Sequence, residues 1–253
     1  MADVYFSGQG IVYVGDRATD GTIIKMVDVG NCPSLSVNFE TDVTNHKESR
    51  TGFRLVDFRL ITEQRARVTM TLEVFKKENL YIALYGAAAT QSTSAVTNES
   101  LGTGIVVNDI VSSKKYPFTT FSITDSAAIP ATLTLGTHYN ILSSHSGLIQ
   151  FINLGSFTQP FKLNYTPVAK DMVTIFESPS KERFLRFSGL NTANTLDPVT
   201  VDLYRTVFDP TGNLALINDE LGQFELEGDV LYDSTRDLDS TLGGFGRVIF
   251  NTP

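Results

Sequence analysis

Three acidic residues alternate along one short segment near the C-terminal end of the sequence. Glu225, Glu227 and Asp229 are separated by single apolar or small residues within Phe224–Val230. Alternation with a period of two predicts a half-buried strand, so the three carboxylates share one face. Like charges in line on one face repel one another unless water or cations screen them. We therefore expect this face to border a water-filled space, as a solvated outer surface or as the wall of an aqueous channel.

Carboxylates at this spacing could also perform acid–base chemistry, as the paired carboxylates of glycosidases do. Such a pair needs two different environments that separate its pKa values, usually in a cleft lined by aromatic side chains. Here the carboxylates share one environment, and the sequence contains no Trp to stack on a sugar. We therefore predict a protein that is not an enzyme and has no catalytic residue, with a hydrolase kept as an alternative.

Other residue types that bind metals or cofactors are sparse. His46, His138 and His145 are scattered, and their spacing does not suit a zinc site. Cys32 is the only cysteine, which excludes an internal disulfide and CxxC chemistry. The sequence has no phosphate-binding loop, nucleophile elbow or complete dinucleotide fingerprint. We expect no metal and no cofactor.

The charge balance restricts the classes of partner. A net charge of −8 argues against a conventional nucleic-acid-binding protein, which needs a basic surface to displace counterions. The first residues lack the basic start and apolar run of a signal peptide. No stretch approaches the roughly 18 apolar residues that a membrane span requires. We expect a chain that folds in a cytoplasm and does not insert into a membrane.

A long charged segment separates two alternating segments in the N-terminal part. Ser34–Phe39 and Arg65–Val74 each alternate polar and apolar residues, which predicts two half-buried strands. Between them, Glu40–Gln64 is predicted to be a long loop, and a loop of this length in a compact domain is disordered or functional. Its mixed charges fit an interface between copies of the chain better than DNA binding. The candidate contact residues are His46, Lys47, Glu48, Arg50 and Arg54.

The remaining sequence indicates a host domain with an insert. Lys76–Gly86 has helical spacing and ends at a glycine, which predicts one short helix. A small, uncharged stretch, residues 87–98, is expected to be a flexible linker. Residues 98–171 contain four bases and four acids and read as short strands separated by turns, which predicts an inserted small β-domain. Long alternating strands resume with Val199–Val207.

The order of these elements resembles the major tail tube proteins of tailed bacteriophages. The resemblance rests on an early strand, a long charged loop, a return strand that leads into a short helix, and a C-terminal half of alternating strands. These are Ser34–Phe39, Glu40–Gln64, Arg65–Gly86 and Val199–Val230. The likeness covers residues 1–86 and 173–253, and it is one of pattern and order. Residues 98–171 depart from the minimal family domain and resemble the extra β-module that some long-tailed phages carry on the tube exterior.

The resemblance implies a mainly β protein: a two-sheet β-sandwich or barrel of the tail tube type with one flanking helix. Residues 1–97 and 172–253 would form the tube domain, and residues 98–171 the insert. Six copies would form a ring, and stacked rings would form the virion tail tube through which DNA passes. Assembly would take place in the host bacterial cytoplasm. The implied partners are further copies, tape measure protein, tail terminator and distal tail proteins, and transiently bound DNA. The tube protein of type VI secretion systems shares the fold.

Within this reading, Glu225, Glu227 and Asp229 are the expected lumen-facing acids, and the candidate loop residues are expected to contact a neighbouring ring. Closing a ring would pair open sheet edges, which otherwise invite aggregation. The alternative from another class is a carbohydrate- or receptor-binding β-sandwich. In that case Tyr116, Tyr139 and Tyr165 of the insert would contact the ligand.

Overall fold

The described part of the chain is mainly β with one short helix. We describe a computed structural model that covers residues 5–193, 196–236 and 241–250. It divides into two compact units, Met1–Ala87 with Val173–Pro253 (unit 1), and Ala88–Met172 (unit 2). The second unit therefore starts ten residues before the expected Asn98. The predicted mainly β class with a single helix is confirmed.

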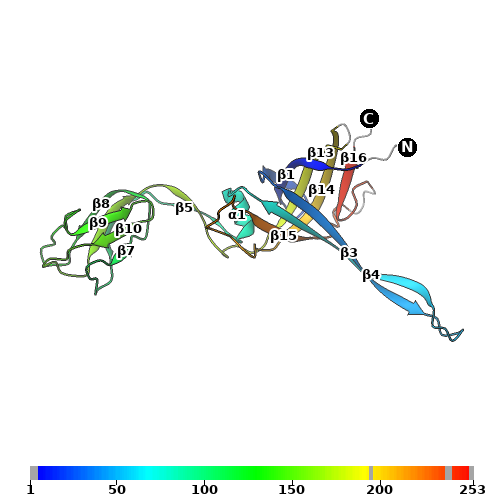
Figure 1. The fold of residues 1–253 in the computed structure, drawn as a ribbon, viewed down its shortest axis with the longest axis horizontal. Helices are drawn as coiled ribbons and strands as arrows, with labels where there is room; N and C mark the ends of the chain where they lie inside the picture. The colour runs from blue at the N-terminus through cyan, green and yellow to red at the C-terminus, as the bar shows by residue number, and fades with distance from the viewer. Residues whose placement is uncertain (1–4, 194–195, 237–240, 251–253) are drawn as a thin grey trace. The chain divides into compact units, whose positions relative to one another are not determined.

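Unit 1 is built on one antiparallel sheet with the strand order β2-β1-β13-β14-β15-β4-β3 (Figure 1). An eighth strand, β16, pairs with the N-terminal half of β14, whereas β15 pairs with the C-terminal end of β14. The bounds are β1 Gly8–Arg17, β2 Ile23–Asp28, β3 Ser34–Lys47, β4 Val56–Leu72, β13 Glu182–Asn191, β14 Asp197–Phe208, β15 Phe224–Val230 and β16 Gly246–Phe250.

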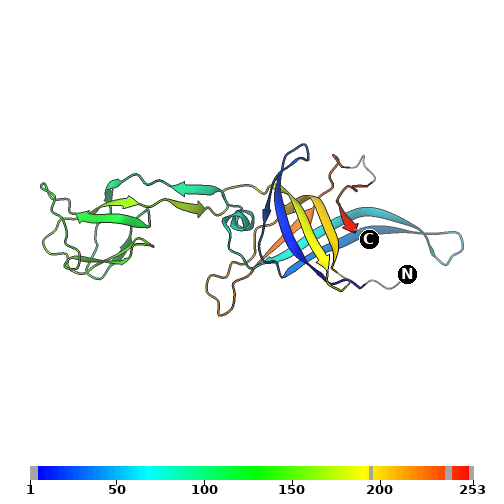
Figure 2. The same ribbon diagram turned by 90° about the horizontal axis from the view of Figure 1, so that it is seen from above.

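The sheet curves until its two ends share one core, as Figure 2 shows from above. Val12 of β1 and Leu185 of β13 are buried in the same cluster as Met70 of β4 and Leu226 of β15. Leu35 of β3 packs against that cluster from the far end of the sheet. The expectation was a two-sheet β-sandwich or barrel, and unit 1 is a single sheet rolled into an incomplete barrel.

The predicted helix is present and covers one end of this core. Helix α1 spans Lys77–Ala83, within the predicted Lys76–Gly86. Ala83 is buried in the core. The buried Asn79 donates through Nδ2 to the carbonyl oxygens of Val29 and Val74, at 2.8 and 2.9 Å. The side-chain amide therefore ties the helix both to the residue that follows β2 and to the short segment between β4 and the helix.

The segment Glu40–Gln64 is not a loop, and this prediction is wrong. Strands β3 and β4 continue through it as one antiparallel ladder, with Glu40 opposite Arg65 and His46 opposite Phe58. Only residues 48–55 connect them. Apolar residues recur through Phe53–Ile61, and cross-strand pairing stabilises them as a strand despite the charged residues between.

The outer side of β13 and β14 is covered by the segment that leads to β16, and buried ion pairs hold it there. Arg17 bonds Asp233 at 2.9 Å, and the two side chains are 5% and 2% exposed. Asp202, 1% exposed, bonds both Arg186 at 2.6 Å and Arg247 of β16 at 3.1 Å. Arg17, Asp233 and Asp202 are desolvated and depend on their partners, whereas Arg186 and Arg247 are each 33% exposed. Together these pairs fix the last strand to the sheet.

Unit 2 is a small sandwich around an aromatic core. One three-stranded sheet has the order β7-β10-β9 and the other β6-β11-β8. Phe151 and Phe161 stack in the core with ring centroids 4.9 Å apart. The strands are β6 Val96–Ser100, β7 Ile110–Ser112, β8 Phe118–Thr124, β9 Tyr139–Ser143, β10 Leu148–Phe151 and β11 Lys162–Pro167.

The predicted flexible linker, residues 87–98, contains two strands instead. β5 (Ala88–Gln91) pairs with β12 (Lys170–Val173), and β6 belongs to the unit 2 sandwich. The amide of Gln91 donates to the carbonyl oxygens of Tyr116 and Val168, at 3.0 and 2.9 Å. Uncharged composition alone does not make a segment flexible when a partner strand is available for its backbone.

Candidate assembly surfaces

The most unusual surface is the hairpin in which β3 and β4 extend beyond the core. We call residues 43–61 the arm. The last core residue of β4 is Ala66, which lies opposite Phe39, and every residue from Val56 to Arg65 is exposed. In Figure 1 the two strands run on together past the rest of the sheet. A lone two-stranded hairpin is marginally stable in water, so an arm of this kind gains stability from further contacts.

The arm carries large apolar side chains that contact solvent. Phe53 is 79% exposed, Phe58 59% and Leu60 52%. Val43 lies opposite Ile61 on one face, and Thr44 lies opposite Leu60 on the other. Apolar residues therefore occur on both faces. Contiguous exposed apolar surface of this kind marks an interaction site. The complete set is Val43, Phe53, Leu55, Val56, Phe58, Leu60 and Ile61.

The five predicted contact residues all lie on the arm. His46 and Lys47 end β3, and the ring of His46 lies 2.6 Å from Asp57. Glu48 orders the tip: its carboxylate accepts hydrogen bonds from the Thr51 hydroxyl and from the backbone N–H of Arg50 and Thr51. These hydrogen bonds lower the pKa of the Glu48 carboxyl group, and the bond from the Thr51 hydroxyl has the largest effect. The structure brings the five predicted residues together on the arm. The exposed apolar side chains beside them were not predicted from the sequence.

Arg50 and Arg54 are exposed at the tip, and Arg54 has a φ of 51°. An arginine in the left-handed region is uncommon, and here it directs the chain back into β4. The tip is therefore an ordered turn with basic side chains in solvent.

The three predicted acids lie where the alternation placed them. Phe224, Leu226, Gly228 and Val230 are buried, and Glu225, Glu227 and Asp229 between them are exposed. Register extends this face across two more strands, because Glu227 lies opposite Thr69, which lies opposite Ser36. We call the outer side of β15, β4 and β3 the acidic face. Its further polar residues are Ser34, Asn38, Glu40, Asp42, Glu63, Arg65, Arg67 and Thr71.

Two arginines partly neutralise the acidic face. Arg67 bonds Glu227 at 2.9 Å and Asp209 at 2.8 Å, and its other nitrogen lies 3.7 Å from Asp229. Arg65 bonds Asp42 at 2.8 Å. The expectation that only water and ions screen the three acids is therefore incomplete. These pairs are about half exposed, so each adds little stability, and the face stays acidic and hydrated.

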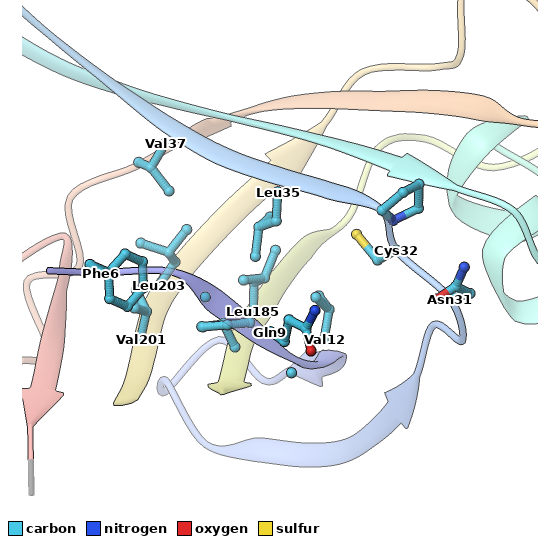
Figure 3. Close-up of a pocket in the computed structure, with 14 residues that line it drawn as sticks. Phe6, Gln9, Val12, Asn31, Cys32, Leu35, Val37, Leu185, Val201 and Leu203 are labelled. Carbon is cyan, nitrogen blue, oxygen red and sulfur yellow. The ribbon is translucent and has the colours of Figure 1, made fainter. Parts of the chain in front are cut away.

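Two hollows adjoin these surfaces. One, of about 710 Å³, is lined by polar residues such as Arg67, Asp209, Gln223 and Glu225. The other, of about 700 Å³, lies in the opening of the incomplete barrel, and we call it the barrel pocket (Figure 3). There Leu35 and Val37 of β3 face Leu185 of β13 and Leu203 of β14.

Two of the three tyrosines that the ligand-binding alternative requires at the surface are buried. Tyr139 and Tyr165 are each 3% exposed within the core of unit 2. The Tyr165 hydroxyl donates to Glu99 at 2.6 Å, and burial, reinforced by this bond, raises the pKa of Tyr165 to about 12. Only Tyr116 is at the surface, where Lys170 lies over its ring at 4.6 Å.

Among residues 5–193, 196–236 and 241–250, no three His, Cys, Asp or Glu side chains are grouped so that they could hold a metal ion. In the same ranges, no helix combines the length and the apolar character needed to cross a membrane.

Comparison with known proteins shows the family of the chain. A family model described as "Protein of unknown function UCP028589" matches residues 5–249. The match spans both units and nearly the whole chain, so the chain belongs to this family. No curated protein matches the sequence.

Proposed function

We propose that this protein is a structural subunit that assembles with copies of itself into stacked rings, forming a tube of the phage tail type. The observation that carries the proposal is the arm. It projects seven large apolar side chains into solvent from a hairpin that makes no core of its own. A surface like this is stable and soluble only when another molecule covers it.

Sheet edges support the same reading. Within the described strands, β2 and β3 stand at the two ends of the order of pairing in unit 1. β3 contributes an edge of 14 residues, which would template aggregation in a lone molecule. Pairing of edges between copies that repeat by rotation closes a ring and removes this hazard, and a second contact surface lets rings stack.

The acidic face suits the inner wall of such a tube. It combines hydroxyl, amide and carboxylate groups, with its arginines already paired to carboxylates. DNA phosphates would find few free cations on this wall, so the DNA would slide without binding. At a Debye length of about 8 Å, the repulsion would act close to the wall. In this proposal Glu225, Glu227 and Asp229 face the lumen, and the protein acts by assembly without catalysis.

Electron microscopy of the purified protein tests the proposal. The expected result is uniform hollow tubes, or rings at low concentration. The double variant Phe53→Asp/Phe58→Asp should remain folded, because both side chains are exposed, and should fail to elongate. The matched control is Ile129→Asp in unit 2, where the side chain is 87% exposed and lies outside the arm. A wild-type protein that stays monomeric at high concentration would overturn the proposal.

A further inference from the structure

The barrel pocket is an apolar hollow that the chain leaves half open. Leu185 is 1% exposed and Val12 2%, so its floor belongs to the core. Its walls include Leu35, Val37 and Val201, which are only partly buried although they point into the hollow. The side chain of Phe6 at its rim is 62% exposed. Apolar surface is therefore in contact with water inside a concave site.

The opening exists because β3 closes over the core without pairing with β1. Within the described part of the chain, β3 is hydrogen-bonded to β4 and ends the sheet, while β1 pairs with β2 and β13. Gly10 of β1 lies so close to β13 that a Cβ atom there would lie 2.4 Å from the backbone of Gly189. Because β3 and β1 are not paired with each other, the pocket lies at the seam between them.

The arm of the same molecule cannot fill its own pocket. β3 lines the pocket with Leu35 and Val37, and it continues without a break into the arm, paired with β4 from Ser34 to Lys47. From Phe39 to Lys47 the extended strand spans roughly 26 Å at about 3.3 Å per residue, and the turn at the tip lies beyond it. Folding the arm back would require breaking the β3–β4 ladder, so its apolar residues stay far from the pocket.

We propose that the barrel pocket receives the arm tip of a second copy of this chain, with Phe53 and Leu55 as the inserted side chains. This inference rests on the proposed function and names the receiving surface for the arm. Both side chains are highly exposed at the turn, 79% and 60%, and the pocket offers an apolar floor of matching character. Burying apolar surface on both sides removes it from water, which stabilises the contact against the cost of association.

Charge favours the same pairing. Residues 46–59 carry four bases and two acids, a net charge of +2, whereas the whole chain carries −8. The arm tip is thus attracted to the remainder of another copy, although whole copies repel one another. Close to the pocket, Asn31 donates to Glu73 at 2.5 Å, so a carboxylate lies near the rim for a tip arginine.

The geometry makes the contact directional. The donor and the receptor lie at opposite ends of one strand, so a copy that inserts its arm into a second copy can receive the arm of a third. Contacts of this head-to-tail kind do not close within a pair and propagate along the assembly. Arm insertion would therefore supply elongation, and edge pairing within a ring would be a separate contact.

Cross-linking tests the inference, because Cys32 lines the pocket and is the only cysteine of the chain. One cysteine is added at the tip, as Phe53→Cys, Leu55→Cys or Ser49→Cys, and the last retains every apolar side chain. The full-length protein is treated at assembly concentration with a short thiol-specific bismaleimide and analysed on a denaturing gel. Head-to-tail insertion predicts a ladder of trimers, tetramers and higher species, whereas symmetric contact between two arms yields dimers only.

Two controls test whether the cross-linked ladder arises from contact between the arm tip and Cys32 in the pocket. The same tip variants with Cys32→Ser should lose every species above the dimer, and Ile129→Cys in unit 2 should give no ladder that depends on Cys32. Electron microscopy of each sample separates this inference from the proposed function. Tubes without a Cys32-dependent ladder would overturn the docking site and leave the tube intact. A ladder without tubes would support the docking site and contradict the tube.

Two further outcomes would overturn the inference. If neither tubes nor a ladder forms, both the docking site and the tube are wrong. If native mass spectrometry of the purified protein shows a bound small molecule, and cysteine labelling of Cys32 is blocked by it, the pocket is a ligand site. Its volume of about 700 Å³ falls in the range of such sites, roughly 300–1,000 Å³.

Discussion

Strands β3 and β4 form two very different surfaces along one continuous ladder. At the base, Val68, Met70 and Leu72 are 0% exposed, and the polar residues between them lie on the acidic face. In the arm, the same two strands expose Phe58, Leu60 and others on both faces. The backbone pairing is the same, but only the base has a core to cover it. This difference underlies the proposal of assembly, in which another molecule would complete the arm.

The largest expected difference between base and arm is in stability. Leu226→Ala removes a fully buried side chain beside β4 and should destabilise unit 1 by about 2–5 kcal/mol. Leu60→Ala makes the same change in the arm, where the side chain is 52% exposed, and should change stability by less than about 0.5 kcal/mol. Urea unfolding followed by circular dichroism measures both. Equal losses would show that the arm belongs to the folded core.

Buried and exposed ion pairs should differ in a similar way. Asp202→Ala removes a carboxylate that is 1% exposed and leaves Arg186 and Arg247, each 33% exposed, without their hydrogen-bond acceptor, which should cost about 1.5–3 kcal/mol. Glu227→Gln removes one partner of Arg67 on the acidic face, and its cost should stay within about 1 kcal/mol. Thermal unfolding of the two variants compares them. A large loss in Glu227→Gln would mean that the acidic face is buried.

Acid should loosen the segment that leads to β16, because Arg205 donates hydrogen bonds both to Glu182 and to the carbonyl oxygen of Tyr232. The hydrogen bond from Arg205 lowers the pKa of Glu182 below its usual 4.5. Stabilisation by this group is complete above pH 4.5 and is lost as the pH falls through the lower, folded-state value. The melting temperature should therefore decrease below pH 4.5, and less so in Glu182→Gln. An identical pH dependence in the variant would contradict this role for Glu182.

The smallest expected effect concerns passage through the lumen. Neutralising two acids, Glu225→Gln/Glu227→Gln, should leave tubes intact in electron micrographs, because both side chains are exposed and lie away from the arm. Added duplex DNA should associate weakly with the variant tubes at low salt, and more than with wild-type tubes. Binding that is equal in both would place these acids outside the lumen.

The sequence predicted β15 well and the arm poorly, for physical reasons. In Phe224–Val230 one face is buried and the other is wet, so the pattern of residues follows the pattern of burial. In the arm neither face is buried by this chain, so the pattern of residues has no pattern of burial to follow. The charged residues suggested a loop, although the alternating apolar residues from Phe53 to Ile61 were a usable strand signal.

Strand β13 was not predicted from the sequence, for the opposite reason. Phe184 is 2% exposed and Leu185 1%, so consecutive residues are buried on both faces of the sheet. Phe184 stacks with Tyr204 under the segment that leads to β16, while Leu185 enters the main core. A strand covered on both faces has no alternation to detect. The buried ion pairs of that segment were missed too, because Arg17 and Asp233 are 216 positions apart in the sequence.

Hydrogen exchange of the arm tests the central claim most directly. Residues 43–61 should exchange rapidly in dilute protein, because an exposed hairpin opens readily, while the β4 base, residues 66–72, stays protected. At concentrations where tubes form, the arm should become protected to nearly the level of the base. Strong protection of the arm at every concentration, with no change on assembly, would contradict the claim that other copies complete it.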